Sequence, residues 1–302
     1  MSVTQLESAE IQLEAPSGLW SDAWRRLVRN PAAIIGFVLV ALFILTALFA
    51  GLIAPYDPRE QNLALLQGSC CPGPSAEHWF GVDDLGRDQF SRVVYGARFS
   101  LLIGVVAVTV GVTFGLLLGA TSGFFGGKID TLIMRLMDIM LAIPGLLLAI
   151  GIAAMLGPGL LSIMIAIGVV NIPIFARLLR GSVLGQKGND FVLAARAVGV
   201  PRRTILVSHI LPNSISPVIV AATLALATAI IDAAGLGFLG LGPQDPSTPE
   251  WGTMLTGTVR YLQTAPHLAI IPGLAIVVSV LGFNLIGDGL REALDPKLRG
   301  RA

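Results

Sequence analysis

Residues 99 to 127 read FSLLIGVVAVTVGVTFGLLLGATSGFFGG, a stretch of the chain without a charged side chain. A helix crosses a bilayer core with roughly 20 consecutive apolar residues, so this stretch is long enough to span a membrane. Its glycines recur at spacings that place them on one helix face, where the missing side chains let another backbone approach closely. We expect a helix contact along this face. It lies either inside this chain or, as the alternative, at a subunit interface or on a face that slides during gating. The glycines concerned are Gly104, Gly111, Gly115, Gly119 and Gly123.

Apolar segments of similar length lie on both sides of this one. They predict further spans at about 32–53, 132–156, 160–176, 215–231 and 267–287. The sequence therefore predicts an all-α, polytopic membrane protein with six transmembrane helices. Prolines within or at the edges of these spans remove backbone donors and favour a multi-helix body with a polar pathway over a simple anchor. They are Pro144, Pro173, Pro217 and Pro272.

The composition agrees with a membrane protein. Of 302 residues, 54% are hydrophobic and 13% are charged, whereas a soluble domain carries about a quarter charged residues. The net charge of +1 gives no indication of nucleic-acid binding, which needs clustered excess Lys and Arg. The first thirty residues are polar, and the apolar run after them exceeds the roughly 7–15 residues of a signal h-region. We therefore expect the first helix to remain as an anchor.

The distribution of Lys and Arg sets the expected orientation. With the amino terminus in the cytoplasm, fifteen of these residues lie inside and five outside, as the positive-inside rule requires. Both termini are then cytoplasmic. The expected organisation is an amino-terminal cytoplasmic tail (1–31), a first transmembrane helix (32–54), an extracytoplasmic loop with an interfacial helix (55–97) and a core of five transmembrane helices (98–302) with an inner loop at about 177–213.

Two extracytoplasmic segments are substantial. The first becomes amphipathic between Arg87 and Arg98, a pattern typical of a helix lying in the membrane interface. The second, 235–266, is rich in Gly and Pro, and Trp251 and Tyr261 are placed where interfacial aromatic residues sit.

Few side chains in or near the spans are charged. Arg135 and Asp138 are three residues apart on one helix and are expected to pair, and Asp232 and Asp288 complete the set. All four lie near predicted span ends, which argues against a proton or ion relay through the membrane.

Signatures of catalysis and metal binding are missing from the sequence. Gly126-Gly127-Lys128 is followed by Ile129, so it is no phosphate-binding loop, and neither H-E-x-x-H nor G-x-S-x-G occurs. We expect no catalytic residue and no metal site. Cys70 and Cys71 are adjacent; we do not expect them to bond to each other, because a trans peptide holds their Cβ atoms apart. We expect no essential role for the two cysteines; a disulfide to a partner protein or a redox-sensitive pair is the alternative.

The long inner loop, 177–213, carries a pattern of its own. Asn189 or Asp190 can cap a helix that begins near Phe191. A compact face of small residues follows, then Gly199 for a sharp turn and Pro201 at the start of another helical segment. A small-residue face gains little from lipid and fits a groove in a cytoplasmic protein better. The face comprises Ala194, Ala195, Ala197 and Val198.

This loop resembles the "EAA" signature of permease subunits in bacterial ABC importers. The matching positions are Leu193-Ala194-Ala195, Gly199 and Leu211-Pro212; Leu193 departs from the usual acidic or polar residue. The resemblance implies an ATPase-coupling loop. Its members are Asp190, Leu193, Ala194, Ala195, Arg196, Gly199, Leu211 and Pro212.

Three further stretches resemble the C-type subunit of the peptide/nickel permease branch. They are HWFGVDDLGRD over 78–88, LGFLGLG followed by PEWG within 236–252, and FNLIGDGLR followed by LDPK within 283–297. The likeness extends over nearly the whole chain from about Pro31. An outer gate or scoop is the expected role of the outer stretches, and tight turns alone are the alternative. The gate would comprise Gly81, Asp83, Asp84, Gly86, Arg87, Asp88, Gly240, Gly242, Glu250 and Trp251.

The resemblance implies a subunit of a bacterial inner membrane, without catalytic activity, that forms half of a translocation pathway. Its expected partners are a homologous second permease, two cytoplasmic ATPases, an extracytoplasmic binding protein and membrane lipid. ATP and Mg would bind the ATPases, and no cofactor would bind this chain. Di- or oligopeptides are the first choice of substrate, with glutathione and nickel as alternatives. A proton-coupled secondary carrier and a purely structural membrane subunit are the alternatives of a different class.

Overall fold

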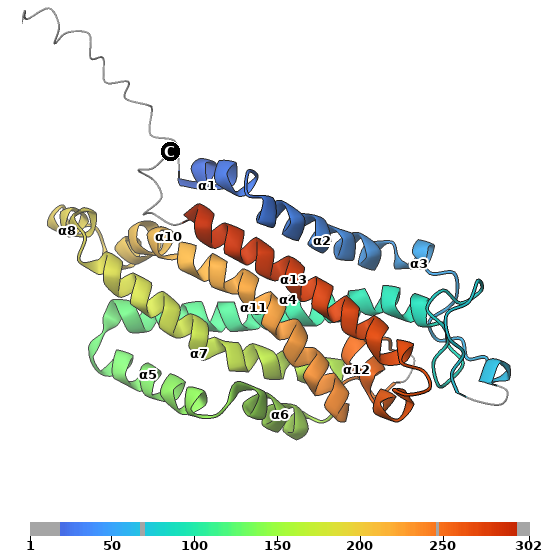
Figure 1. The fold of residues 1–302 in the computed structure, drawn as a ribbon. Helices are drawn as coiled ribbons and strands as arrows, with labels where there is room; N and C mark the ends of the chain where they lie inside the picture. Colours follow the sequence, from blue (N-terminus) through green and yellow to red (C-terminus); the bar gives the residue numbers. More distant parts are fainter. Residues whose placement is uncertain (1–18, 67–69, 246–247, 295–302) are drawn as a thin grey trace, which may run out of the picture.

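The computed structural model describes residues 19–66, 70–245 and 248–294, and Figure 1 shows them as a bundle of long helices lying side by side. Within these ranges the only β-structure is an isolated bridge between Val82 and Asp88. The all-α class is confirmed.

Among the described residues, five helical elements are long and apolar enough to cross a membrane, and the count is six if a bent pair of helices is taken as one span. The count agrees with the six predicted spans. The elements are α2 (Pro31–Leu48), α4 (Gln89–Phe125), the pair α5 (Gly127–Ala142) and α6 (Gly145–Leu156), α7 (Leu160–Lys187), α11 (Ser216–Leu236) continued by η4 (Gly237–Leu241), and α13 (His267–Leu294).

Short elements occupy the two ends of the bundle (Figure 1). At one end, called here the α8 end, lie α1 (Leu19–Leu27), α8 (Asp190–Ala197), α9 (Arg202–Thr204), η3 (Ile205–Ile210) and α10 (Leu211–Ser214). At the opposite end, called the α12 end, lie α3 (Ala50–Ile53), η2 (Leu63–Leu66), α12 (Trp251–Leu255) and η5 (Thr258–Tyr261).

The glycine face of α4 packs against α7. A Cβ atom added at Gly115 would lie 2.5 Å from Cβ of Phe175, and one at Gly119 would lie 2.5 Å from the backbone oxygen of Ala176. Gly104 instead faces Ile230 of α11, at 3.3 Å from its Cγ1. The stripe is therefore used for packing inside this chain, which is the first of the two alternatives.

The expected interfacial helix over Arg87–Arg98 is the buried first part of α4. This helix has 37 residues, or about 55 Å at 1.5 Å per residue, against about 30 Å of hydrocarbon. Ser91, Arg92 and Val94 are all buried. The apolar positions of this segment pack on the chain itself, so its amphipathic pattern reflects burial in protein and not in lipid.

The third predicted span is not one continuous helix. The axes of α5 and α6 meet at 93° across Ile143 and Pro144, because proline cannot donate the backbone hydrogen bond that would continue α5. The expected pair of Arg135 with Asp138 is also wrong. Asp138 pairs with Arg177 of α7 instead, since the helix contact brings that guanidinium closer than the local spacing does.

Two spans continue beyond their predicted ends. Helix α7 runs through to Lys187, eleven residues past the expected limit, and the fifth span continues from α11 through η4 to Leu241. Asp232 therefore lies inside a span and not near its end, contrary to expectation.

Substitution Gly119→Val should destabilise the α4–α7 contact by about 1–3 kcal/mol, the range for overpacking a filled interior. The matched control is Gly181→Val on α7, where an added Cβ meets no atom within 4 Å. Thermal unfolding of the purified protein in detergent measures the difference. Equal melting temperatures for the two variants would contradict the assigned contact.

Candidate functional site

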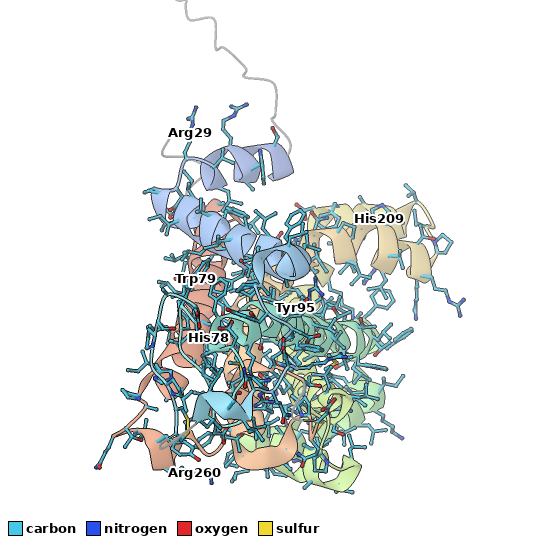
Figure 2. The ribbon with its side chains drawn as sticks, turned by 90° about the vertical axis from the view of Figure 1, so that its right-hand side faces the viewer. Arg29, His78, Trp79, Tyr95, His209 and Arg260 are labelled. Atoms are coloured by element: carbon cyan, nitrogen blue, oxygen red, sulfur yellow. A yellow bond between two sulfur atoms is a disulfide. The ribbon has the colours of Figure 1, made fainter. Side chains whose placement is uncertain are left out.

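A helical knob projects from the α8 end of the bundle. We define it as residues 188–210, which comprise α8, α9, η3 and their connections. Figure 2 shows the part that carries His209 extending sideways beyond the long helices. Helix α7 leads into the knob: its 28 residues measure about 42 Å, some 12 Å more than a hydrocarbon core of about 30 Å.

The turn that folds the knob depends on Gly199. Its φ is +79°, a left-handed conformation that only glycine adopts readily. The Val200 N–H donates to the carbonyl of Ala195, and the Gly199 N–H donates to that of Arg196, both at 3.0 Å. These two bonds form a Schellman motif, which satisfies carbonyl groups at the end of α8.

The knob has a buried and an exposed face. Val192, Ala195, Ile205 and Ile210 are buried and join the main hydrophobic core, so α8 is fixed to the bundle. Its tip is apolar yet exposed: Val198 is 79% exposed and Leu193 51%. Three exposed arginines accompany this tip: Arg196, Arg202 and Arg203. Exposed apolar groups beside like charges suit a protein groove with acidic groups at its edge.

Charged and polar contacts hold the base of the knob. Lys187 donates to the carbonyl of Phe124 at 2.7 Å, at the carboxyl end of α4, where the helix dipole favours a cation. Arg180 forms a two-pronged ion pair with Asp130 of α5, at 2.5 and 2.7 Å. Ser182 donates to the carbonyl of Ser214 at 3.0 Å. A force on the knob would therefore reach α4, α5 and α7 together.

The predicted coupling residues do not all lie at the tip. Asp190 begins α8, and Asn189 occupies the cap position, but no side chain caps the helix. The Asn189 amide donates to Gln186 Oε1 at 2.8 Å instead, so the expected side-chain cap is wrong. Leu211 and Pro212 lie in α10, behind the knob and next to the first turn of α11.

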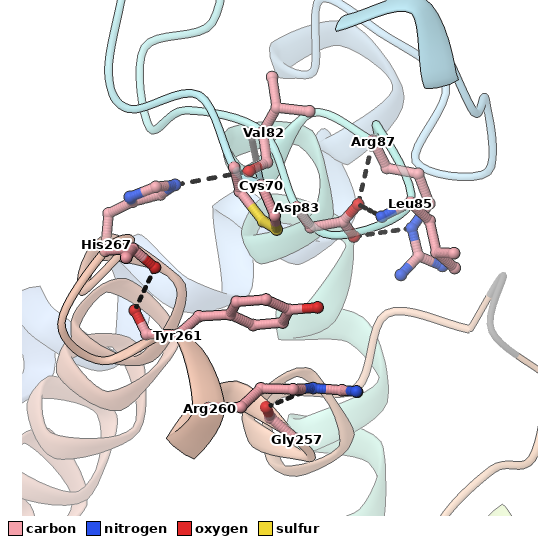
Figure 3. The surroundings of a disulfide bond; sticks show 11 residues. Cys70, Val82, Asp83, Leu85, Arg87, Gly257, Arg260, Tyr261 and His267 are labelled. Carbon is pink, nitrogen blue, oxygen red and sulfur yellow. Dashed lines mark hydrogen bonds and ion pairs between the residues drawn. A yellow bond between two sulfur atoms is a disulfide. The ribbon is translucent and has the colours of Figure 1, made fainter. Parts of the chain in front are cut away.

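At the α12 end, the segment before α4 forms a tight ionic turn. Asp83 accepts from the backbone N–H groups of Leu85 (3.0 Å) and Arg87 (2.9 Å). Its other oxygen lies 2.7 Å from Nε of Arg87 and 3.3 Å from Nε of Arg92. Figure 3 shows this turn standing over the ring of Tyr261. Charges this deeply buried are stable only when they are paired, so the turn is a fixed part of the structure.

Two further contacts fix the start of α4. The Asp88 carboxylate accepts from the N–H of Ser91 at 2.7 Å and caps the helix. Its second oxygen lies 2.9 Å from Nδ1 of His78, whose ring packs on that of Tyr56 with centroids 4.8 Å apart.

Trp251 is fully buried and is not an interfacial aromatic residue, contrary to expectation. Its indole N–H donates to the carbonyl of Val93 at 3.0 Å, and its ring lies edge-on to Phe43. It covers Gly96 so closely that a Cβ there would lie 2.6 Å from the indole ring. The loop before α12 is thereby anchored to α4.

Glu250 anchors the same loop from the other side. Its two carboxylate oxygens accept from the N–H groups of Gly252 and Thr253, each at 2.8 Å, and Ser100 Oγ lies 3.4 Å away. Burial raises the pKa of the Glu250 carboxyl above its usual range, and these hydrogen bonds offset the rise only in part.

Cys70 and Cys71 are joined by a disulfide across a cis peptide bond, close to Tyr261 in Figure 3. The expectation that the neighbours would not bond assumed a trans peptide, and it is wrong. Cys71 is buried together with Ala265 and Leu268, so the pair belongs to the packing of the α12 end.

Between the Asp83 turn and η5 lies a polar pocket lined by Arg87, Gln89, Arg92 and Tyr261, among others. Its cavity volume of about 80 Å³ is far below the roughly 300–1,000 Å³ of small-molecule sites. It is too small to hold a substrate.

The structure brings the predicted gate residues together at the α12 end, but most of them are buried. Asp83, Arg87 and Asp88 are used in internal pairs, and only Asp84 and Gly240 retain appreciable exposure. The glycines of this group make tight turns or close packing, as the alternative held, and the gate role stays a prediction. Arg92, Gly96 and Ser100 also take part in the contacts at the α12 end, but the sequence did not identify them. All three lie in a segment whose pattern indicates only an amphipathic or apolar helix.

The raised pKa of Glu250 gives a testable dependence on pH. In the folded state the Glu250 carboxyl stays protonated at pH values above its unfolded pKa of about 4.3. Its contribution to the free energy of unfolding is therefore fully present below the unfolded pKa and is lost as the pH rises through the folded-state pKa. The variant Glu250→Gln cannot titrate here. Its melting temperature relative to wild type should therefore increase between pH 4 and pH 8. Parallel profiles would show that the pKa is not raised.

Two family models match the chain. The model described as "binding-protein-dependent transport system inner membrane component" matches residues 111–300. The model described as "N-terminal TM domain of oligopeptide transport permease C" matches residues 18–68.

Curated relatives match over nearly their whole length. The chain is 51% identical over 280 residues to the dipeptide transport system permease protein DppC of Alkalihalophilus pseudofirmus, covering 93% of this chain and 90% of the relative. It is 46% identical over 297 residues to the di/tripeptide transport system permease protein DppC of Pseudomonas aeruginosa, covering 98% and 97%. It is 48% identical over 285 residues to the glutathione transport system permease protein GsiD of Escherichia coli O157:H7, covering 93% and 91%.

The fold is also similar to a solved structure of the MetNI methionine ABC transporter in inward-facing conformations. The TM-score is 0.56 at 21% identity, over 68% of this chain and 96% of the other. The matched models and relatives together cover both the first span and the bundle. The chain belongs to the family of binding-protein-dependent transport system inner membrane components, as a C-type ABC permease subunit of the bacterial inner membrane.

Proposed function

We propose that this chain is the permease subunit of an ATP-driven importer of di- or oligopeptides, and that it receives its driving force through the knob. The observation that carries the proposal is the exposed apolar tip at Leu193 and Val198, held on a rigid base and closed by the Gly199 turn. A surface of this kind suits a groove in a second protein. The names of the DppC relatives support peptides as substrates.

The partners are proposed on the same grounds. Two cytoplasmic ATPases bind beneath the α8 end, a homologous second permease completes the pathway, and an extracytoplasmic binding protein delivers substrate to the α12 end. Both termini are then cytoplasmic. ATP and Mg bind the ATPases, while this chain has no catalytic role and binds no cofactor. ATP shifts the assembly because it binds one arrangement of the subunits more tightly than the other.

Glutathione is the second candidate substrate. The glutathione permease GsiD is 48% identical to this chain, close to the values for the two DppC proteins. Selectivity would rest largely on the binding protein, so affinity measurements with that protein separate the two candidates.

Substitution Gly199→Asp should leave the transporter assembled but abolish the ATP hydrolysis that substrate and binding protein stimulate, because the turn at φ +79° is lost and the tip leaves its groove. The matched control is Gly126→Asp, at φ +69° with equally open surroundings but outside the knob. Stimulated ATP turnover in proteoliposomes is the measurement. Normal turnover in the Gly199 variant would remove the coupling assignment.

Cross-linking tests the docking of the binding protein. Asp84 and Asp245 are accessible at the α12 end, so a cysteine at either position should form a cross-link to the binding protein when ATP is bound. Cysteine at Glu60, also exposed, serves as the control. If neither position forms a cross-link, the result favours the alternative that these segments make tight turns and do not form a gate.

A further inference from the structure

Asp232 is a carboxylate inside a membrane span. The element that contains it runs over 26 residues, from Ser216 to Leu241, and carries no other charged residue. Its midpoint lies between Thr228 and Ala229, so Asp232 lies only about 5 Å beyond the midpoint along the axis. Centring this element on a hydrocarbon core of about 30 Å places Asp232 about 10 Å inside the boundary of the core.

The neighbours of Asp232 divide the helix into two faces. One face is buried against the bundle: Ala229, Ile230, Ala233, Ala234 and Leu236. The other is exposed in this single chain and carries Thr228, Ile231 and Leu239. Asp232 is partly exposed at the boundary between the two faces. Gly235 lies about one turn further on, where an added Cβ would meet Leu146 of α6 at 3.9 Å.

Within residues 19–66, 70–245 and 248–294, no group donates a hydrogen bond to Asp232 or forms an ion pair with it. The other acidic residues in the described spans differ. Asp130 pairs with Arg180, and Asp138 pairs with Arg177. Near the end of α13, Asp288 is exposed and Glu292 accepts a hydrogen bond from Asn30.

An unpaired carboxylate at this depth does not face lipid. Ionisable residues inside a membrane face a bundle interior or a water-filled cavity, and they pair with a group of opposite charge. The exposed face of α11 beside α6 is therefore covered by protein or by the aqueous pathway in the assembled transporter. The side chain then needs a cation that the described residues of this chain do not supply.

We propose that Asp232 lines the translocation pathway and binds the ammonium group of the substrate during transfer. This inference rests on the proposed function. Dipeptides, tripeptides and glutathione, the substrates named for the relatives, all carry a primary ammonium group at neutral pH. A carboxylate in surroundings of low dielectric binds such a group by a charge-assisted hydrogen bond that is stronger than in water.

The test uses the complete transporter in proteoliposomes, with its second permease, ATPases and binding protein, and trialanine as the probe. Variant Asp232→Asn should lower trialanine import at low concentration by about ten-fold or more, because the charge partner is lost, whereas Asp232→Glu should retain most of it. The control Asp288→Asn removes an exposed carboxylate of the same kind and should import like the wild type. Import by Asp232→Asn at the wild-type rate would overturn the proposal.

Two other roles of the carboxylate give different results. If Asp232 pairs with a cation of the second permease, Asp232→Asn should lose that subunit on purification. If it relays protons, wild-type import should fall when the pH gradient is dissipated. Either result overturns the proposal.

Cysteine accessibility decides the location independently of import. Asp232→Cys, in a Cys70→Ser, Cys71→Ser background, should react with a cationic methanethiosulfonate reagent, and trialanine with the binding protein should slow the reaction. No reaction in any nucleotide state would place the position away from the pathway and overturn the proposal. If the wild type imports no peptide, the proposed function fails, while this reaction still shows whether Asp232 faces water.

Discussion

The rest of the structure depends on the close contact between α4 and α7. Side chains are missing at Gly111, Gly115, Gly119 and Gly123, so the backbone of α7 approaches α4 almost without a gap. Within lipid, helices gain little from hydrophobic burial against one another and depend on dispersion over such close surfaces. This contact joins α7 to α4, the longest helix among the described residues, and makes the two helices one unit.

That unit links the two ends of the molecule. Helix α4 begins at the Asp88 cap and the Trp251 anchor, and it ends at the carbonyls that accept from Lys187. Helix α7 continues past the membrane into the knob. Movement of the knob would therefore reach the α12 end through two packed helices, which transmit displacement because a close-packed interface deforms little.

The charged residues are arranged differently at the α12 end, near the α8 end and in the middle of the bundle. At the α12 end, Asp83, Arg87 and Arg92 neutralise one another in a buried turn. Near the α8 end, Asp130 and Asp138 pair with arginines of α7. Asp232 lies between these levels, where the surrounding helices offer it no such partner among the described residues. A substrate ammonium group in the pathway would supply the charge partner that the described residues do not.

The sequence by itself determined the helical class, the number of spans and the glycine face of α4, because hydropathy and residue spacing are local properties. The sequence motif of the inner loop also located the knob, because the turn at Gly199 is formed by residues that are close together in the sequence. The tertiary structure decided which contacts distant segments make: Arg177 pairs with Asp138, and Trp251 is buried over Gly96. It decided the bend at Pro144 as well. It also decided the depth of Asp232, because the span's end is set by packing of η4 and not by the local pattern. Contacts between segments far apart in the chain leave no local signal in a single sequence.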